Sequence, residues 1–143
     1  MAITSVVSNH FKYQQAVKKI DFENDVFKAI LLDTTFVFDK DAHATLADAT
    51  SHQLASANGY TQDDKTLAGV TVTENDTDDR AEITWTNVTW TASAGNIGPA
   101  GALIIYDDTT ADKTVVGCVD FGTDYTIADG SSLQFQNLAF YNN

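Results

Sequence analysis

The chain has 143 residues, enough for one domain, and its 43% of hydrophobic against 20% of charged residues argues against a wholly disordered protein. The formal net charge of −12 makes phosphate backbones and anionic membranes poor partners. Asp and Thr are frequent, and because Asp favours turns and Thr favours strands, a helical bundle is disfavoured. We therefore expect one β domain over residues 1–143, with a helical segment at 1–20 and a β-sandwich at 21–143.

The first predicted element is a helix over residues 5–20, which Thr4 or Ser5 can cap. Its apolar face follows spacings of four, three, four and three residues, typical of an α-helix. The side chains on this face are Val6, His10, Tyr13, Val17 and Ile20. The first 28 residues hold half of all the basic side chains, so a slightly positive segment precedes an acidic body. Such a helix can dock on its own domain or on a neighbouring copy.

The next segments alternate between strand patterns and turns. Residues 26–38 are rich in β-branched and aromatic side chains and predict one long central strand or two. Residues 39–59 are polar and predict a surface excursion that holds a short helix between 41 and 54. Two further strand signals, GYT and TLAGVTVTE, precede a turn at ENDTDD.

The stretch RAEITWTNVTW at residues 80–90 is the strongest strand signal. Apolar Ile83 and Trp85 alternate with polar side chains, but at Asn87 the phase slips by one residue, so that Val88 and Trp90 continue the apolar face. A bulge, or a tight corner between two short strands, explains the slip. Both Trp are expected to anchor a core between two sheets, the alternative for Trp90 being an exposed binding aromatic.

The rest of the chain continues the β pattern. Residues 91–101, which contain the only proline, predict a flexible loop, and ALIIY from residue 102 predicts a buried strand. A loop at DDTTAD leads to the strand TVVGCVDF, a turn-rich stretch and a final strand or pair of strands in SLQFQNLAFY. Seven or eight short strands after one helix predict an antiparallel β-sandwich or jelly-roll-like domain.

Candidates for catalysis are few. The three histidines, His10, His43 and His52, have no Ser, Cys or carboxylate partner at a motif spacing, and no phosphate-binding or nucleophile motif occurs. Cys118 lies alone among apolar neighbours and is expected to be a buried, unreactive side chain. The opening residues do not match a signal peptide, so we expect synthesis in a cytoplasm without export by a signal of its own.

A cation site in the 39–59 excursion is the sharper chemical hypothesis. Its oxygen and imidazole side chains suit hard or borderline cations. They are Asp39, Asp41, His43, Asp48 and His52. Their spacing matches no metal-binding loop, and a solvated loop is the simpler interpretation. We therefore assign no catalytic, cofactor-binding or metal residue and expect a protein that is not an enzyme.

Several segments together resemble a family of small structural proteins of tailed bacteriophages, described as head-decoration, minor capsid or fibre-associated proteins. They are the N-terminal helix leading into IDFENDVFKAILL, the DKDAH…LAD excursion, GYT…KTLAG, RAEITWTNVTW, ALIIYDD and VGCVDFG, in the same order over most of the chain. The C-terminal LQFQNLAFYNN differs from the Trp-containing run usual in the family. The resemblance implies a virion component without catalytic activity, present in many copies and held by protein contacts.

Three functions compete on this basis. The first is a capsid decoration or cement protein in the virion, bound to the major capsid protein or other virion proteins. It is expected to form a homo-oligomer, with a trimer favoured. Its expected contacts are the apolar face of the N-terminal helix and the loop at 95–101. The second is a tail, neck or fibre-associated adhesin whose contacts are Tyr106, Tyr125 and Tyr141. The third is a small metal-dependent hydrolase built on His43 and His52.

Overall fold

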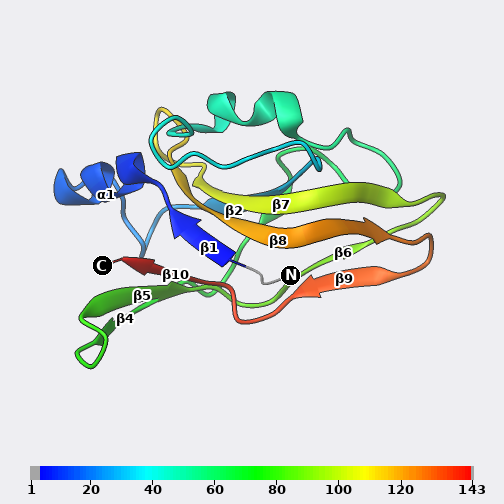
Figure 1. Ribbon diagram of the computed structural model, residues 1–143. Helices are drawn as coiled ribbons and strands as arrows, with labels where there is room; N and C mark the ends of the chain where they lie inside the picture. The colour runs from blue at the N-terminus through cyan, green and yellow to red at the C-terminus, as the bar shows by residue number, and fades with distance from the viewer. Residues whose placement is uncertain (1–3, 143) are drawn as a thin grey trace.

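Antiparallel strands stacked in two layers form the body of this protein in its computed structural model, which describes residues 4–142 (Figure 1). Strands account for 45% and helix for 10%, so the mainly β, sandwich-like fold predicted from the sequence is confirmed. The elements in chain order are β1 (Thr4–Val7), α1 (Asn9–Ala16), β2 (Phe27–Leu32), the 3-10 turns η1 (Leu46–Asp48) and η2 (Thr50–His52), β3 (Lys65–Thr66), β4 (Thr71–Asn75), β5 (Arg80–Thr84), β6 (Val88–Thr91), β7 (Ile97–Asp107), β8 (Val115–Ile127), β9 (Ser132–Phe135) and β10 (Ala139–Asn142).

The first layer is a five-stranded sheet with the strand order β1-β8-β7-β2-β3. The second layer consists of a three-stranded sheet, β10-β5-β4, and a two-stranded sheet, β6-β9. Strands β4 and β5 form a hairpin that projects from one end of the body, and we call residues 71–84 the β4–β5 arm (Figure 1). The predicted turn at ENDTDD is the tip of this arm. Because the second layer is split in two, the sandwich has open edges.

The stretch around the two tryptophans turns a corner between the two sheets of the second layer. Strand β5 ends at Thr84 and β6 begins at Val88, and the two strands belong to different sheets. The phase slip at Asn87 is therefore a corner between two short strands, which is one of the two predicted alternatives. Trp85 is 5% exposed and Trp90 is 2% exposed. Both are core anchors, and the alternative of an exposed Trp90 is wrong.

The main core fills the space between the layers. Phe27, Leu103 and Ile105 contribute from the first layer, whereas Ile83 and Phe140 contribute from the second, and all five are buried. Inward and outward residues alternate along each strand, and the inward-facing ones exclude water from the space between the sheets.

A second apolar cluster lies on the opposite face of the five-stranded sheet. Residues 33–54, which we call the covering segment, lay Phe36 and Leu46 over Ile30, Leu32 and Ile104. The polar excursion predicted at 39–59 therefore buries a face of the sheet. This explains why the central strands are apolar on both sides and read as continuous hydrophobic runs.

The covering segment differs from prediction in its local structure. Strand β2 ends at Leu32 because the Asp33 carboxylate accepts a hydrogen bond of 2.9 Å from the Thr35 amide and turns the chain, so residues 33–38 are not a strand. In place of the short helix expected between 41 and 54 there are two 3-10 turns, η1 and η2. The GYT segment is not a strand either: Tyr60 is buried, and its hydroxyl accepts a 3.0 Å hydrogen bond from the Leu31 amide.

The helix predicted at residues 5–20 is shorter and faces differently. Residues 1–3 lie outside the described residues; the next four form β1, which pairs with β8, and α1 spans only Asn9–Ala16. Ser8 caps it, in place of Thr4 or Ser5, by accepting a 3.3 Å hydrogen bond from the Phe11 amide. Phe11 is the buried side chain of α1, whereas Tyr13 is 60% exposed and Val17 is 42% exposed. The predicted apolar face is therefore wrong, since Val6 lies in β1 and Tyr13 and Val17 are exposed.

Two predicted loops are parts of long strands. Strand β7 starts at Ile97 and includes Pro99, so the expected flexible loop at 91–101 is strand over its last five residues. Strand β8 runs on to Ile127 through the turn-rich segment. The pairing of β7 with β8 shifts register on either side of Ala100, and these bulges accommodate the proline and glycines inside a strand. Within residues 4–142, no helix has the length and apolarity needed to span a membrane.

A candidate binding groove at the open edge of the sandwich

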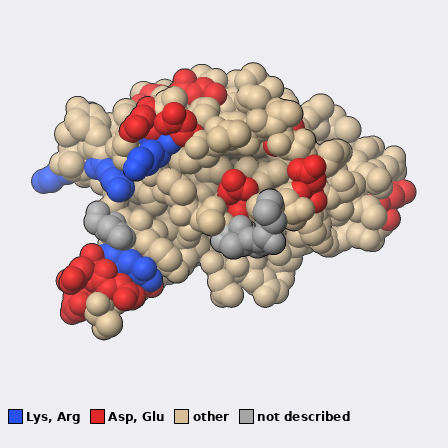
Figure 2. Space-filling model, in the orientation of Figure 1, with Lys and Arg blue, Asp and Glu red and all other residues tan. Residues whose placement is uncertain are grey.

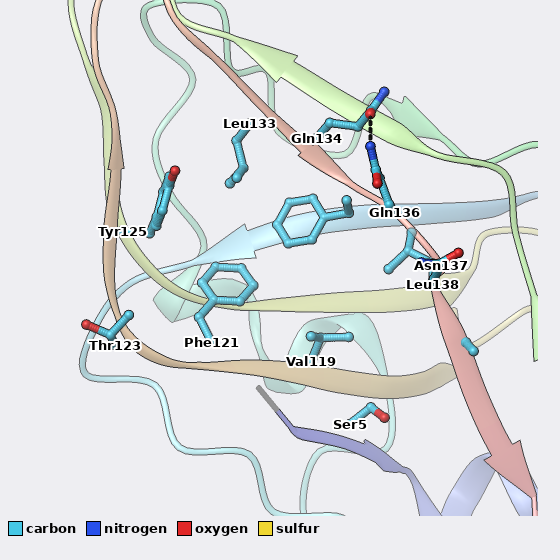
Figure 3. Close-up of a pocket in the computed structure, with 12 residues that line it drawn as sticks. Ser5, Val119, Phe121, Thr123, Tyr125, Leu133, Gln134, Gln136, Asn137 and Leu138 are labelled. Carbon is cyan, nitrogen blue, oxygen red and sulfur yellow. Dashed lines mark hydrogen bonds between the residues drawn. The ribbon is translucent and has the colours of Figure 1, made fainter. Parts of the chain in front are cut away.

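A groove opens where the two layers diverge beside β1. Among residues 4–142, β1 pairs with β8 from Gly117 to Asp120, and no other described strand pairs with β8 along that edge. Beyond this point β8 faces β9 and the segment that leads into β10, and the space between them has a volume of about 460 Å³ (Figure 3). The groove is therefore bounded by β8 on one side and by β9 with the segment before β10 on the other.

Apolar side chains from both layers form the floor of the groove. From β8 come Val119 and Phe121, which are buried, and from the opposite wall come Leu133, Phe135 and Leu138. The rings of Phe121 and Phe135 lie 5.4 Å apart, which joins the two walls. The floor is continuous with the main core. It is therefore held in place by the packing of the sandwich, as a preformed binding site requires.

The rim of the groove is polar but uncharged. Tyr125, which is 46% exposed, and Thr123 stand on the β8 side, opposite Gln134 and Gln136 (Figure 3). The side-chain amide of Gln136 donates a hydrogen bond of 2.7 Å to the side-chain oxygen of Gln134. All of the 12 lining residues are uncharged, although the chain carries a net charge of −12. The groove is thus the neutral part of an acidic surface.

Two strand edges border the groove. Within residues 4–142, β9 pairs only with β6, and the edge of β8 from Phe121 to Ile127 has no partner strand on the groove side. Unpaired backbone N–H and C=O groups on a strand edge can pair with an extended chain. The Asp120 carboxylate accepts a 2.8 Å hydrogen bond from the Gly122 amide and so blocks one of these groups.

His10 lies apart from the other two histidines, His43 and His52, which both pack against the ring of Phe36. His10 makes a 2.8 Å contact with Asp112, whereas His52 contacts Asp33 at 3.3 Å. His43 accepts a hydrogen bond from the Asp39 amide. Sequence spacing could not show these two histidine–carboxylate pairs, because the partners in each pair come from different parts of the chain.

The acids of the expected cation site hold their own loops together. The Asp39 carboxylate accepts hydrogen bonds from the amides of Asp41 and Ala42, which lower its pKa from the ordinary value. The Asp48 carboxylate accepts from the amides of Ala44 and Thr45, and its pKa is lowered mainly by the latter. Across the described part of the chain, no three His, Cys, Asp or Glu side chains gather in a set that could hold a metal ion.

The exposed tyrosines predicted for an adhesin divide into two kinds. Tyr125 at the groove rim and Tyr141 on β10 are 46% and 43% exposed. Tyr106 is completely buried, because it points into the second apolar cluster under the covering segment, and its assignment as a surface contact is wrong. Cys118 is 2% exposed, and burial raises the pKa of its thiol to about 12. The expectation of a buried cysteine is confirmed.

A buried carboxyl group was not expected from the sequence. Asp107, at the end of β7, is fully buried, and its Oδ1 accepts a 2.9 Å hydrogen bond from the Thr109 amide. Burial, followed by a hydrogen bond with the Asp25 carboxyl, raises the pKa of Asp107 to about 7. In the sequence Asp107 belongs to an acidic run that is typical of a solvated loop.

Sequence reasoning missed the groove itself, although it identified the strands that border it. The only available signal was the change of phase in the tail, from Leu133 and Phe135 to Leu138 and Phe140, which marks the gap between β9 and β10. Compared with protein-family models, curated proteins and solved structures, this chain gives no match.

Proposed function

We propose that this protein is a non-enzymatic virion structural protein that decorates the capsid, and that its groove holds an extended, uncharged segment of the major capsid protein. One observation carries the proposal: an acidic protein has an apolar, charge-free groove bordered by strand edges that are unpaired within residues 4–142. The resemblance of several sequence segments to tailed-phage virion proteins supports the same class of function.

The groove suits an extended polypeptide. A strand laid along β8 or β9 gains main-chain hydrogen bonds, and its alternate side chains enter the groove. Each apolar side chain that becomes buried there contributes about 1.5–3 kcal/mol before the costs of association. A charged segment loses its hydration without gaining an ionic partner, because the lining offers none. Modest contacts of this kind become strong in a shell, where many copies act together.

The direct test adds charge and bulk at the rim of the groove. In the variant Thr123→Arg the long cationic side chain stands in the groove, whereas Thr126→Arg makes the same change at an exposed position of β8 that does not line it. Particles assembled without this protein are mixed with each variant and sedimented. We expect Thr123→Arg to lose particle binding by roughly tenfold or more and Thr126→Arg to retain it. Equal binding by both variants, with unchanged melting temperatures, refutes the assignment of the groove.

A tail or fibre-associated adhesin is the second candidate, and the exposure of Tyr125 at the groove rim favours it. An exposed aromatic ring beside a polar rim can contact a host surface molecule. Copy number separates the two functions: a content in purified particles similar to that of the major capsid protein supports decoration, whereas a content similar to that of tail components supports adhesion.

A further inference from the structure

The basic residues of this acidic protein differ in whether they form ion pairs. Among the residues that the structure describes, Lys28 and Lys113 pair with Asp108, and Arg80 pairs with Glu82 at 2.9 Å. Lysines on or just after α1 make no ion pair within this part of the chain; they are Lys12, Lys18 and Lys19. All three are exposed. We call these lysines, together with Tyr13 and Val17, the α1 patch.

The α1 patch also exposes apolar surface. Tyr13 is 60% exposed and Val17 is 42% exposed, because α1 is anchored to the body through Phe11 on its other side. Large side chains that remain exposed beside charged ones are typical of a surface that binds another protein. The sequence predicted that this helix segment docks on its own domain or on a neighbouring copy, and the structure leaves this part of it uncovered.

The β4–β5 arm carries the opposite charge. Its side contains a hollow of about 710 Å³ whose lining includes Val72, Asn142, three acids and one base; the acids are Glu74, Asp76 and Asp79, and the base is Arg80, which pairs with Glu82. Val72 is 45% exposed, so this surface also combines apolar with charged groups. Glu74 and Asp76 are exposed and form no ion pair within residues 4–142. The hollow is thus an open acidic concavity with an apolar wall.

The α1 patch and the β4–β5 arm project from the same end of the molecule (Figure 1). On the face drawn in Figure 2, the blue side chains lie at this end; one group touches the red arm, and the others lie above it, beside a second red group. Strand β10 separates the two features, and Asn142 on β10 donates a 2.8 Å hydrogen bond to Gln15 of α1. One end of the chain therefore presents a basic apolar surface beside an acidic hollow.

We infer that this end is a self-complementary interface, where two copies meet about a two-fold axis and the α1 patch of each enters the acidic hollow of the other. A two-fold axis places the α1 patch of each copy against the acidic hollow of the other copy, so both contacts form at once. Opposite charges steer the encounter, and burial of Tyr13, Val17 and Val72 stabilises the complex. This arrangement makes a dimer, in place of the trimer favoured from the sequence, and it does not depend on the proposed function of the groove.

A charge-swap experiment tests the interface. The variant Lys12→Glu with Lys19→Glu makes the whole end acidic, and Glu74→Lys with Asp76→Lys makes it basic. The control, Asp64→Lys with Asp129→Lys, changes the net charge as much as the second variant does, at exposed positions outside both features. The mass in solution is measured by light scattering at low and high salt, and melting temperatures verify folding.

We expect the wild-type protein and the control to have twice the 15.5 kDa mass of the chain, with an affinity that falls in high salt. Each swapped variant should be monomeric alone, and an equimolar mixture of the two should recover the dimer, because the acidic end then meets the basic one. A wild-type monomer at the highest soluble concentration, a trimer, dimers that persist in both variants, or a mixture that stays monomeric each overturns the inference.

Discussion

The indole ring of Trp85 meets the phenyl ring of Phe27 edge-on, with ring centroids 5.6 Å apart and ring planes inclined at 63°. Phe27 begins β2 in the first layer, whereas Trp85 follows β5 in the second, so the contact joins the two layers. Phe140 also packs edge-on against Trp85, at 6.0 Å. Stability therefore depends on a small aromatic cluster between the sheets.

Replacing Trp85 by Ala should lower the free energy of unfolding by about 3–5 kcal/mol, because the cavity would lie between the layers. Urea unfolding followed by circular dichroism measures this change. Val37→Ala is the control: its side chain is 80% exposed, and we expect a change within about 0.5 kcal/mol. Similar losses for both variants would contradict the assignment of Trp85 as a core anchor.

Gly117 is required by the close approach of β1. A Cβ atom at this position would lie 2.4 Å from the Val6 carbonyl oxygen and 2.7 Å from the Phe140 ring. Gly117→Ala should therefore destabilise the protein by about 1–3 kcal/mol or more, since the neighbouring atom is backbone. Gly130→Ala is a comparison without crowding, because no atom lies within 4 Å of its Cβ and only the positive φ of 81° opposes the change. Thermal unfolding that ranks Gly130→Ala as the more harmful would show that β1 is not so closely packed.

The buried carboxyl of Asp107 should make stability depend on pH. Its pKa is raised from an ordinary 3.8 to about 7, so the folded state holds the proton more tightly than the unfolded state does. The resulting stability is fully present below about pH 4 and is lost as the pH rises through 7. Asp107→Asn removes this titration while keeping an oxygen for the Thr109 amide. The variant should therefore gain on the order of 2 kcal/mol relative to wild type between pH 5 and pH 8.

The measurement is chemical denaturation of both proteins at the two pH values, with Asp124→Asn, an exposed position, as the control. A constant difference between Asp107→Asn and wild type across this range would show that Asp107 does not hold a proton in the folded state.

Cys118 should be unreactive in the folded protein. Its side chain is buried, and a thiol whose pKa is about 12 contains little thiolate at pH 8. An aromatic disulfide reagent should label the denatured chain at once and the native chain only at the rate of opening or unfolding. Rapid labelling of the native protein, with an unchanged circular dichroism spectrum, would show that β8 is more accessible than the structure indicates.

The strands and the core were predictable because local patterns determine them. The alternation around Ile83 and Trp85, and its slip at Asn87, correspond to two strands and a corner. The length of β7 and β8 was not predictable, since Pro99 and Gly122 are turn residues by composition and the pairing of the two strands continues past them through register shifts.

The features that the sequence did not predict depend on tertiary contacts. The spacing that suggested an apolar helix face includes Val6, whose backbone pairs with Cys118 in a sheet. The groove is lined by residues from β8 and from the segment around β9, which are far apart along the chain. The raised pKa of Asp107 depends first on its burial and then on Asp25, which lies 82 positions earlier in the sequence. Neither feature leaves a local signal.

The pairing of β1 with β8 has a consequence for biosynthesis. In chain order β1 precedes every other described element, yet Thr4 lies opposite Asp120. Most of the protein must therefore be synthesised before β1 can pair with β8. Such long-range pairing slows two-state folding to the range of milliseconds to seconds. The nascent chain thus carries its apolar strands unprotected during synthesis, and it is in this interval that we expect chaperones to matter most.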